Sequence, residues 1–227
     1  MEAIKKKAST TSANVPKSKV EDWETSDLVE RYNRGEMKVM LESIFPRGGP
    51  LYGTTRVTVR AQGLEELVDA FPNPKCKFGL NTMIVDATYV KCTKKPLGFY
   101  EKERDNQALN ETCIECDASP PKEEPEILDV QVSLTGKFDD VYTSMPYRYF
   151  RPVKIEGIYP RYGPKDGDTV VQIWGQNFLD LGDDFRCNFG TSSTKAYYIN
   201  DNFIWCRAAF SDVVDRPMPF SVSLNRQ

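Results

Sequence analysis

An internal repeat restricts the fold of this chain more than any other feature of its sequence. Residues 155–177 repeat residues 41–63 at an offset of 114 positions. From position 158 to position 176, nine of the nineteen residues are identical or conservatively replaced in the earlier copy, including Pro160 and Gly163. Such self-similarity marks tandem copies of one structural unit, so it sets the domain organisation before any local pattern is considered.

Further matches extend the repeat and reveal an insertion in the first copy. The match at Cys76 has an offset of 111 positions, the match at Tyr89 an offset of 109, and the match at Ile114 an offset of 90. The first copy therefore holds 19 additional residues (109 − 90), which we place at about 91–111 and expect to form a surface loop. Long surface loops often carry binding functions. The candidate protein contacts in this insertion are Lys94 and Lys95.

The repeat divides the chain into two domains. Its 227 residues suffice for two domains of about 100 residues, each able to bury its own core. We assign residues 37–151 to the first domain and residues 152–227 to the second. Because the linker around residues 151–154 is short, we expect the two domains to be held end to end with restricted articulation.

The second copy ends differently from the first. It stops soon after Leu224, the counterpart of Leu134, and contains nothing equivalent to residues 138–150. We therefore expect the second domain to lack its last strand. An unpaired strand edge exposes backbone donors and acceptors. Either the continuation of a longer chain supplies the strand, or a partner donates it by β-augmentation.

Short alternating strands account for most of both copies. In the first copy Val57 and Val59 alternate with Thr58 and Arg60, which is the period of a half-buried strand. Glycine and proline turns, such as the one at residues 46–50, separate these segments, and neither copy contains a helical pattern. This organisation predicts an all-β chain of two tandem immunoglobulin-like β-sandwiches.

The first 36 residues are expected to form a mostly irregular, partly disordered N-terminal arm. A short helix is predicted between residues 20 and 34, capped by Thr25 or Ser26. Two alternatives stay open: this segment is a linker that packs loosely on the first domain, or it is an arm that docks on a partner. The aromatic anchors of a docking arm would be Trp23 and Tyr32.

The motifs of the second copy are specific enough to indicate a family. It contains Ile-x-x-Ile-x-Pro-x-x-Gly-Pro from Ile155, then Gly-x-Thr-x-Val-x-Ile-x-Gly-x-Asn-Phe from Gly167, then Cys-x-Phe-Gly, Ile-x-Cys and Val-Ser-Leu-Asn. This set resembles the IPT/TIG family of immunoglobulin-like domains, strongly over residues 153–227 and less strongly over residues 39–150. In the first copy the Gly-x-Asn-Phe element is reduced to Ala-Gln-Gly-Leu at residues 61–64.

The resemblance implies a fold more directly than a function. Domains of this family are spacers or interaction modules in plexin-like and Met-like receptors, and they accompany the DNA-reading domain of Rel-type transcription factors. They also occur as accessory domains of some enzymes and as repeats in large ciliary and cytoskeletal proteins. The family carries no catalytic or cofactor-binding residues that could be transferred to this chain.

Composition argues against an enzyme and against nucleic-acid binding. The chain has no histidine, which removes the commonest general base and the commonest metal ligand. Its formal net charge is −3, so it offers no overall positive field for phosphates. We therefore predict no catalytic residues, no cofactor and no nucleic-acid partner.

The six cysteines fall into pairs in the repeat. We expect the two members of each equivalent pair to lie on neighbouring strands, as buried thiols in preference to disulfides. The third pair brackets the insertion and could close it into a loop. The pairs are Cys76 with Cys116, Cys187 with Cys206, and Cys92 with Cys113.

No metal site is predicted. Residues 113–116 form a single Cys-x-x-Cys, which is a weak zinc signal without a second such pair. The aspartates between residues 166 and 184 lack the spacing of a known calcium loop. A glycosylation sequon at Asn110 matters only if the chain is extracellular.

The favoured function is that of a non-enzymatic scaffold whose tandem domains bind other proteins, with a ciliary or cytoskeletal assembly as the most concrete setting. The chain has no apolar run long enough for a membrane span, and its first residues lack the apolar core of a secretory signal. We therefore expect an intracellular, cytoplasmic or cytoskeletal protein. Two alternatives remain: the extracellular part of a plexin-like receptor, and the DNA-associated module of a transcription factor.

Overall fold

The computed structural model describes residues 17–79, 83–93, 108–139, 141–212 and 216–226. One helix precedes a succession of strands. In chain order the helix and the strands are α1 (Lys17–Asn33), β1 (Met40–Phe45), β2 (Gly48–Pro50), β3 (Val57–Gln62), β4 (Lys75–Phe78), β5 (Ile84–Thr93), β6 (Ala108–Cys116), β7 (Ile127–Ser133), β8 (Met145–Phe150), β9 (Lys154–Tyr159), β10 (Val170–Gln176), β11 (Arg186–Phe189), β12 (Ser192–Asn200), β13 (Phe203–Arg207) and β14 (Phe220–Ser223). A short 3-10 turn, η2 (Gly182–Asp184), lies between β10 and β11.

The strands form two sheets, and the six strands of the second follow the same order as the six strands β1, β3, β6, β5, β4 and β7 of the first. The first sheet has the order β1-β3-β6-β5-β4-β7-β8-β2, and the second has the order β14-β11-β12-β13-β10-β9. In each sheet one strand passes from one layer to the other: residues 84–86 of β5 pair with β4 while residues 87–93 pair with β6. Strand β12 does the same between β11 and β13. Each sheet is thereby folded into two layers, which we call the first sandwich (β1–β8) and the second sandwich (β9–β14).

Each sandwich encloses its own apolar core, because alternate residues of its strands point inward. Val57 and Val59 of β3 are fully buried in the first core, and their counterparts Val171 and Ile173 are buried in the second. The prediction of an all-β chain made of two immunoglobulin-like sandwiches is confirmed.

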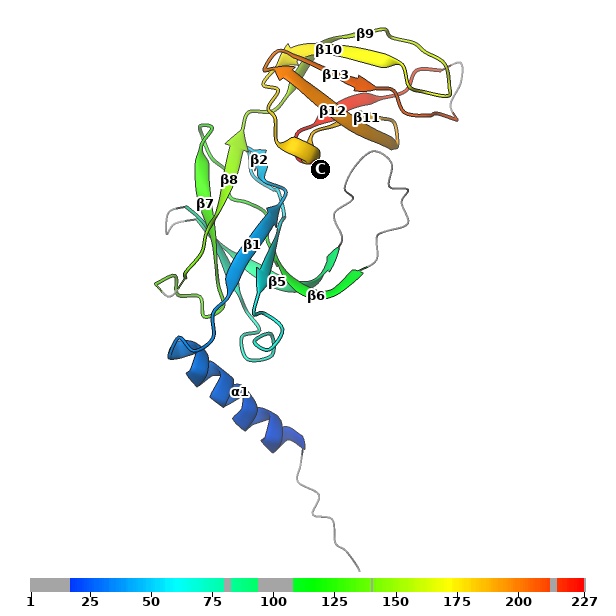
Figure 1. Cartoon of the computed structure of the whole chain (residues 1–227). Helices are drawn as coiled ribbons and strands as arrows, with labels where there is room; N and C mark the ends of the chain where they lie inside the picture. The colour runs from blue at the N-terminus through cyan, green and yellow to red at the C-terminus, as the bar shows by residue number, and fades with distance from the viewer. Residues whose placement is uncertain (1–16, 80–82, 94–107, 140, 213–215, 227) are drawn as a thin grey trace, which may run out of the picture.

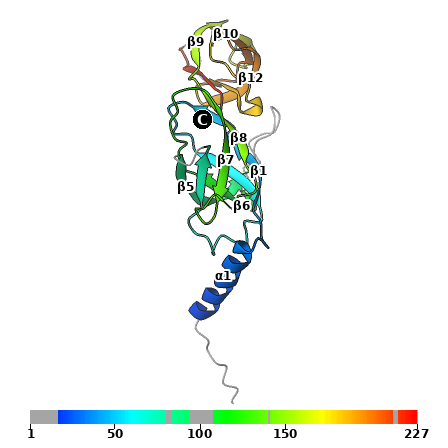
Figure 2. The ribbon, with the colours of Figure 1, turned by 90° about the vertical axis from the view of Figure 1, so that its left-hand side faces the viewer.

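The two sandwiches follow one another along the molecule, and α1 projects from the far end of the first (Figures 1 and 2). Three residues, 151–153, separate β8 from β9. Phe150, the last residue of β8, nevertheless packs in the second core, and the Asn177 side chain donates a hydrogen bond of 2.9 Å to the Pro152 carbonyl. The end of the first sandwich thus takes part in the packing of the second.

The N-terminal segment is more regular than expected. Helix α1 has 17 residues and begins at Lys17, so Thr25 and Ser26 lie inside it and do not cap it. Residues 1–16 lie outside the described part of the chain. The helix is polar over most of its length, and its ion pairs between residues four apart favour it: Arg31 with Asp27 at 3.9 Å and Arg34 with Glu30 at 3.6 Å. The predicted short helix at residues 20–34 is therefore present, but it begins three residues earlier than expected and is not capped by Thr25 or Ser26.

Two other local predictions need correction. The segment 46–50 is not only a turn, because β2 within it pairs in parallel with β8. The insertion is not a surface loop throughout, because residues 91–93 and 108–111 lengthen the hairpin of β5 and β6. Residues 94–107 lie outside the described part of the chain.

Within the part of the chain that the structure describes, no helix combines the length and the apolar character that crossing a bilayer requires.

Candidate protein-interaction sites

Three disulfides join all six cysteines. Cys76 is bonded to Cys116, Cys187 to Cys206, and Cys92 to Cys113, with Cα atoms 5.8, 6.4 and 5.1 Å apart. The expectation of buried thiols is therefore wrong for this structure. The expectation of neighbouring strands is also wrong for two pairs, because β5 lies between β4 and β6, and β12 lies between β11 and β13. These two disulfides link the opposite layers of their sandwiches.

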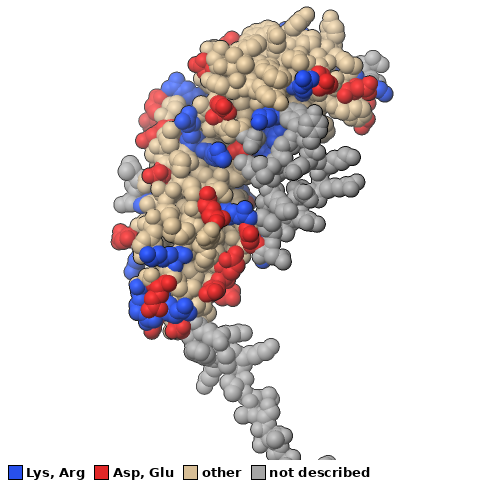
Figure 3. Space-filling model, viewed as in Figure 1, with Lys and Arg blue, Asp and Glu red and all other residues tan. Residues whose placement is uncertain are grey.

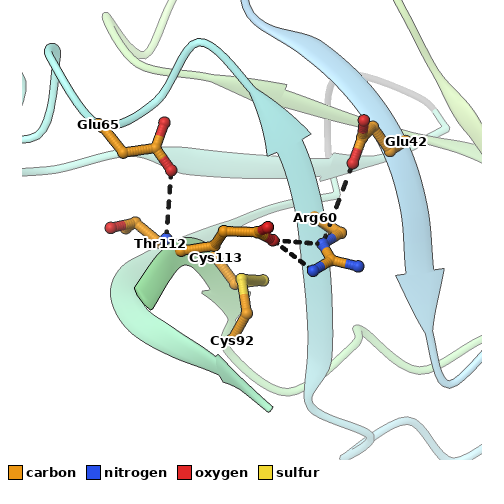
Figure 4. Close-up of a disulfide and its surroundings, with 7 residues drawn as sticks. Glu42, Arg60, Glu65, Cys92, Thr112 and Cys113 are labelled. Carbon is orange, nitrogen blue, oxygen red and sulfur yellow. Dashed lines mark hydrogen bonds and ion pairs between the residues drawn. A yellow bond between two sulfur atoms is a disulfide. The ribbon is translucent and has the colours of Figure 1, made fainter. Parts of the chain in front are cut away.

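The Cys92–Cys113 disulfide closes the base of the insertion, where charged groups surround it (Figure 4). The Arg60 guanidinium donates a hydrogen bond from Nε to the Glu111 carboxylate at 3.0 Å, and Glu42 lies 4.0 Å from the same nitrogen. Glu65 accepts a bond of 3.4 Å from the Thr112 amide. These contacts tie the β6 side of the hairpin to the body of the first sandwich, so the insertion starts from a fixed base.

Helix α1 docks on the first sandwich through its last turns. Val29 and Tyr32 pack against the first core, and the rings of Tyr32 and Phe71 lie 4.9 Å apart. The Phe71 carbonyl in turn accepts a hydrogen bond of 2.7 Å from the Tyr89 hydroxyl. Burial, with a smaller contribution from Tyr32, raises the pKa of Tyr89 to about 12. The Tyr32 ring thus packs against the first sandwich of its own chain, and its role as an anchor for a partner protein stays a prediction.

The other predicted contact residues lie where the structure gives no side-chain position. Trp23 belongs to α1, but its side chain is outside the described part of the chain, and so are Lys94 and Lys95 altogether. A stacked aromatic pair on the outer face of the second sandwich was not predicted from the sequence. There the rings of Tyr197 and Trp205 stack with their centroids 4.0 Å apart. In the sequences of β12 and β13, Tyr197 and Trp205 alternate with small or aliphatic residues that are buried, and this pattern could have predicted the stacked pair.

A groove of about 580 Å³ lies beside β14 in the second sandwich. Residues 160–165 and 216–220 line it, together with Ile158, Thr169, Val171, Phe189, Ala208, Ala209 and Ser211. We call it the β14 groove. In the first sandwich the corresponding place, between β2 and β7, is occupied by β8. No described strand lies beside β14 on this side, since β14 ends the order of the second sheet.

Residues that face the β14 groove are more exposed than their counterparts beside β8 in the first sandwich. Val130 and Phe78 in the first sandwich are 0% exposed. Their counterparts, Phe220 and Phe189, are only half-buried. Residues 48–50 are all buried under β8, whereas residues 162–164 are all exposed, Tyr162 to 88%. The described residues at the β14 groove therefore expose positions whose counterparts β8 covers in the first sandwich.

Charges of both signs alternate over the first sandwich in the view of Figure 3, and few charges appear on the visible face of the second. Among the described residues, no group of three or more aspartate, glutamate, cysteine or histidine side chains is arranged to hold a metal ion. The first sandwich therefore offers mixed charges to a partner, whereas the visible face of the second offers few.

Comparisons with known proteins identify part of the chain. The sequence model of the family described as IPT/TIG domain matches residues 152–227. Two solved structures of the full extracellular region of plexin A4, spanning domains 1 to 8 and domains 1 to 10, match 84% of this chain at 21% identity, with TM-scores of 0.46 and 0.49. The chain covers only 17% and 15% of those two chains. The comparison with curated proteins gives no match.

Proposed function

We propose that the chain is a non-enzymatic protein-interaction module of the extracellular space, from the premise that residues 152–227 match the model of the IPT/TIG domain family. Its two sandwiches would present strand edges, the disulfide-closed hairpin and the helix α1 to protein partners. The single observation that carries the extracellular setting is the pairing of all six cysteines in disulfides.

The redox argument favours this setting over the cytoplasm. Disulfides persist in oxidising compartments, whereas the cytosol keeps most thiols reduced. The six cysteines lie at buried positions, with exposures of 0 to 3%. A cytoskeletal or ciliary scaffold would have to fold with these positions as thiols. No observation on the structure supports that alternative, and the three disulfides oppose it.

The absence of histidine from the sequence supports a non-enzymatic role, because general acid–base catalysis most often uses that side chain. The match to the IPT/TIG domain family supports the same role, because proteins that share such a fold have the scaffold in common and not a catalytic reaction. Binding would then depend on surface chemistry, as it does in other immunoglobulin-like sandwiches.

Thiol labelling of the native chain tests the proposal. The chain, purified from cells without a reductant, is denatured and treated with a maleimide before and after reduction. We expect no label before reduction and six labels after it, with the three bonded pairs identified by mass spectrometry of peptides. Six labels before reduction would refute the extracellular assignment and restore the intracellular alternative.

Glycosylation gives an independent readout. Asn110 lies on β6 within the sequon Asn110-Glu-Thr112. When the chain is directed through a secretory pathway, we expect a loss of mass on glycosidase treatment that Asn110→Gln abolishes. Asn188→Gln is the matched control, because Asn188 is not in a sequon. A secreted chain without sugar at Asn110 would remove this second line of support for the extracellular setting.

A further inference from the structure

We propose that the outer face of the second sandwich binds a neutral, extended oligosaccharide of β-linked pyranose rings. This surface, which we call the outer aromatic face, consists of Tyr159, Gln172, Trp174, Tyr197, Phe203 and Trp205. The inference goes beyond the proposed protein-binding function, because it assigns a second class of ligand. Three observations carry it: the rows of aromatic rings, the amide that lies among them, and the lack of charge on this surface.

Strand pairing arranges these side chains in rows across β9, β10, β13 and β12. The longer row consists of directly paired residues: Tyr159, Gln172, Trp205 and Tyr197. In the next row Trp174 lies between Gly157 and Phe203. Val171 and Ile173, which alternate with these positions on β10, are buried in the core. Both rows therefore face outward, because successive side chains of a strand point to opposite faces.

A glycine gives the Trp174 indole its place on this face. A Cβ at Gly157 would collide with the indole, so the ring occupies the space that a side chain at residue 157 would fill. The indole thus extends over the backbone of β9, and it is still 41% exposed. Tyr159, the next outward residue of β9, is 65% exposed. These two rings form an accessible aromatic surface on which a ligand can stack.

The other end of the longer row is rigid. The rings of Tyr197 and Trp205 are stacked, with an angle of 6° between their planes. They come from directly paired residues of β12 and β13, so the two strands and the stack fix them together. Rings that are already fixed lose little conformational freedom when a ligand binds, and more of the contact energy is retained as affinity.

Gln172 supplies polar contacts between the rings. It lies between Tyr159 and Trp205 in the longer row, it is exposed, and its side-chain amide makes no hydrogen bond within the described part of the chain. The amide offers two donors and one acceptor. A pyranose ring matches this combination, because its C–H groups pack on the negative face of an aromatic ring while its hydroxyls pair with an amide.

The outer aromatic face carries no charge, since none of its six residues is acidic or basic. Charged groups border it: Arg207 forms an ion pair of 2.8 Å with Asp168, and the Lys195 ammonium lies 5.9 Å from the centre of the Tyr197 ring. Figure 3 shows few charges at the upper end of the second sandwich, where β9 and β10 lie. A neutral ligand is therefore favoured over a polyanion, which would need several cations on this surface.

The arrangement on a sheet favours a ribbon-like ligand. The longer row crosses four strands, which corresponds to about 14 Å at a spacing of about 4.8 Å between neighbouring strands. That length exceeds a single sugar ring. A β-linked glucan is an extended ribbon that presents C–H groups on both of its faces, whereas its α-linked isomer coils and matches a row of rings less well.

Titration of the full chain with cellohexaose tests the proposal. In a Trp23→Phe background the two remaining tryptophans, Trp174 and Trp205, both belong to the outer aromatic face, so their emission should change saturably. Chitohexaose, which has the same linkage, shows whether acetamido groups are accepted. Maltohexaose, the α-linked isomer, is the control ligand and should bind at least about tenfold more weakly. Added salt should leave the affinity unchanged, because a neutral ligand has no charge to screen.

Variants of the protein test the assigned residues. Tyr159→Ala should weaken binding by about tenfold through the loss of one stacked ring. Gln172→Leu, which keeps the size of the side chain, should weaken binding by about fivefold through the loss of hydrogen bonds. Tyr52→Ala is the matched control, since Tyr52 is a tyrosine of the first sandwich with a similar exposure of 63%. It should leave the affinity unchanged. Unfolding curves should be nearly the same for all three variants, because these side chains are exposed.

Several results would overturn the inference. The β-linked and α-linked oligosaccharides could bind equally, Tyr159→Ala could retain full affinity, or emission could show no saturable change at millimolar concentrations. A dimer in sedimentation that Tyr159→Ala dissociates would assign the face to a second copy of the chain and would equally overturn it. Thiol labelling and the sugar at Asn110 do not depend on this face, so failure of this proposal and failure of the proposed function are distinguishable.

Discussion

Removing the Cys187–Cys206 disulfide by the paired substitution Cys187→Ala and Cys206→Ala should destabilise the second sandwich selectively. The two cysteines are 19 positions apart, and both are fully buried. The bond links β11 to β13 across the two layers. Its loss releases an otherwise closed loop in the unfolded chain and removes two sulfur atoms from the core.

The expected loss follows from the length of the loop. A closed loop of about 20 residues corresponds, in the chain-entropy description, to about 3 kcal/mol at 25 °C. A domain of this size has a free energy of unfolding on the order of 4 to 11 kcal/mol, at roughly 0.05 to 0.15 kcal/mol per residue. The disulfide therefore supplies a large share of the stability of the second sandwich.

Tryptophan fluorescence reports this transition. The chain has three tryptophans, and Trp174 and Trp205 both lie in the second sandwich. In a Trp23→Phe background, urea unfolding followed by emission therefore monitors the second sandwich. With a slope of about 1 kcal/mol per molar urea, the midpoint should fall by about 3 M.

A matched variant provides the control. Cys92→Ala with Cys113→Ala removes a disulfide of the first sandwich with a similar separation of 21 positions. It should leave the tryptophan transition in place. A fall of less than about 0.5 M for the Cys187 and Cys206 variant, or a wild-type midpoint that is the same with and without reductant, would refute the reasoning.

Three further predictions concern the junction, the exposed sheet and the helix dock. Phe150→Ala should cost the second sandwich about 3 to 5 kcal/mol in the same urea assay, because this residue of β8 packs in the second core. Gly157→Ala should displace the Trp174 indole, which a Cβ at residue 157 would meet, and shift its emission, with a loss of about 1 to 3 kcal/mol. The pKa of Tyr89 is raised to about 12 in the folded chain from 10.0, so the unfolded chain ionises first, and stability should fall as the pH rises from about 10 to 12. Tyr89→Phe should make that fall shallower in unfolding curves measured across this pH range, and an unchanged slope would contradict the assigned cause.

The fold could be predicted from the sequence because the two copies of the repeat share the same pattern of strands and turns. Residues that match across the repeat occupy matching places in the structure: Ala87 pairs with Cys116, and Ala196 pairs with Cys206. Glycine and proline turns between short alternating segments were sufficient for the fold class. The helix was underestimated because ion pairs and a docked last turn stabilise it, and neither contributes to an apolar periodicity.

The positions of the cysteines show what the alignment of the two copies could not predict. The repeat correctly relates Cys76 and Cys116 to Cys187 and Cys206, but it places residues along a chain and not in layers. Strands β5 and β12 each turn from one layer to the other in mid-strand, so cysteines expected on adjacent strands face each other across a sandwich. No residue within those strands marks the crossing in the sequence.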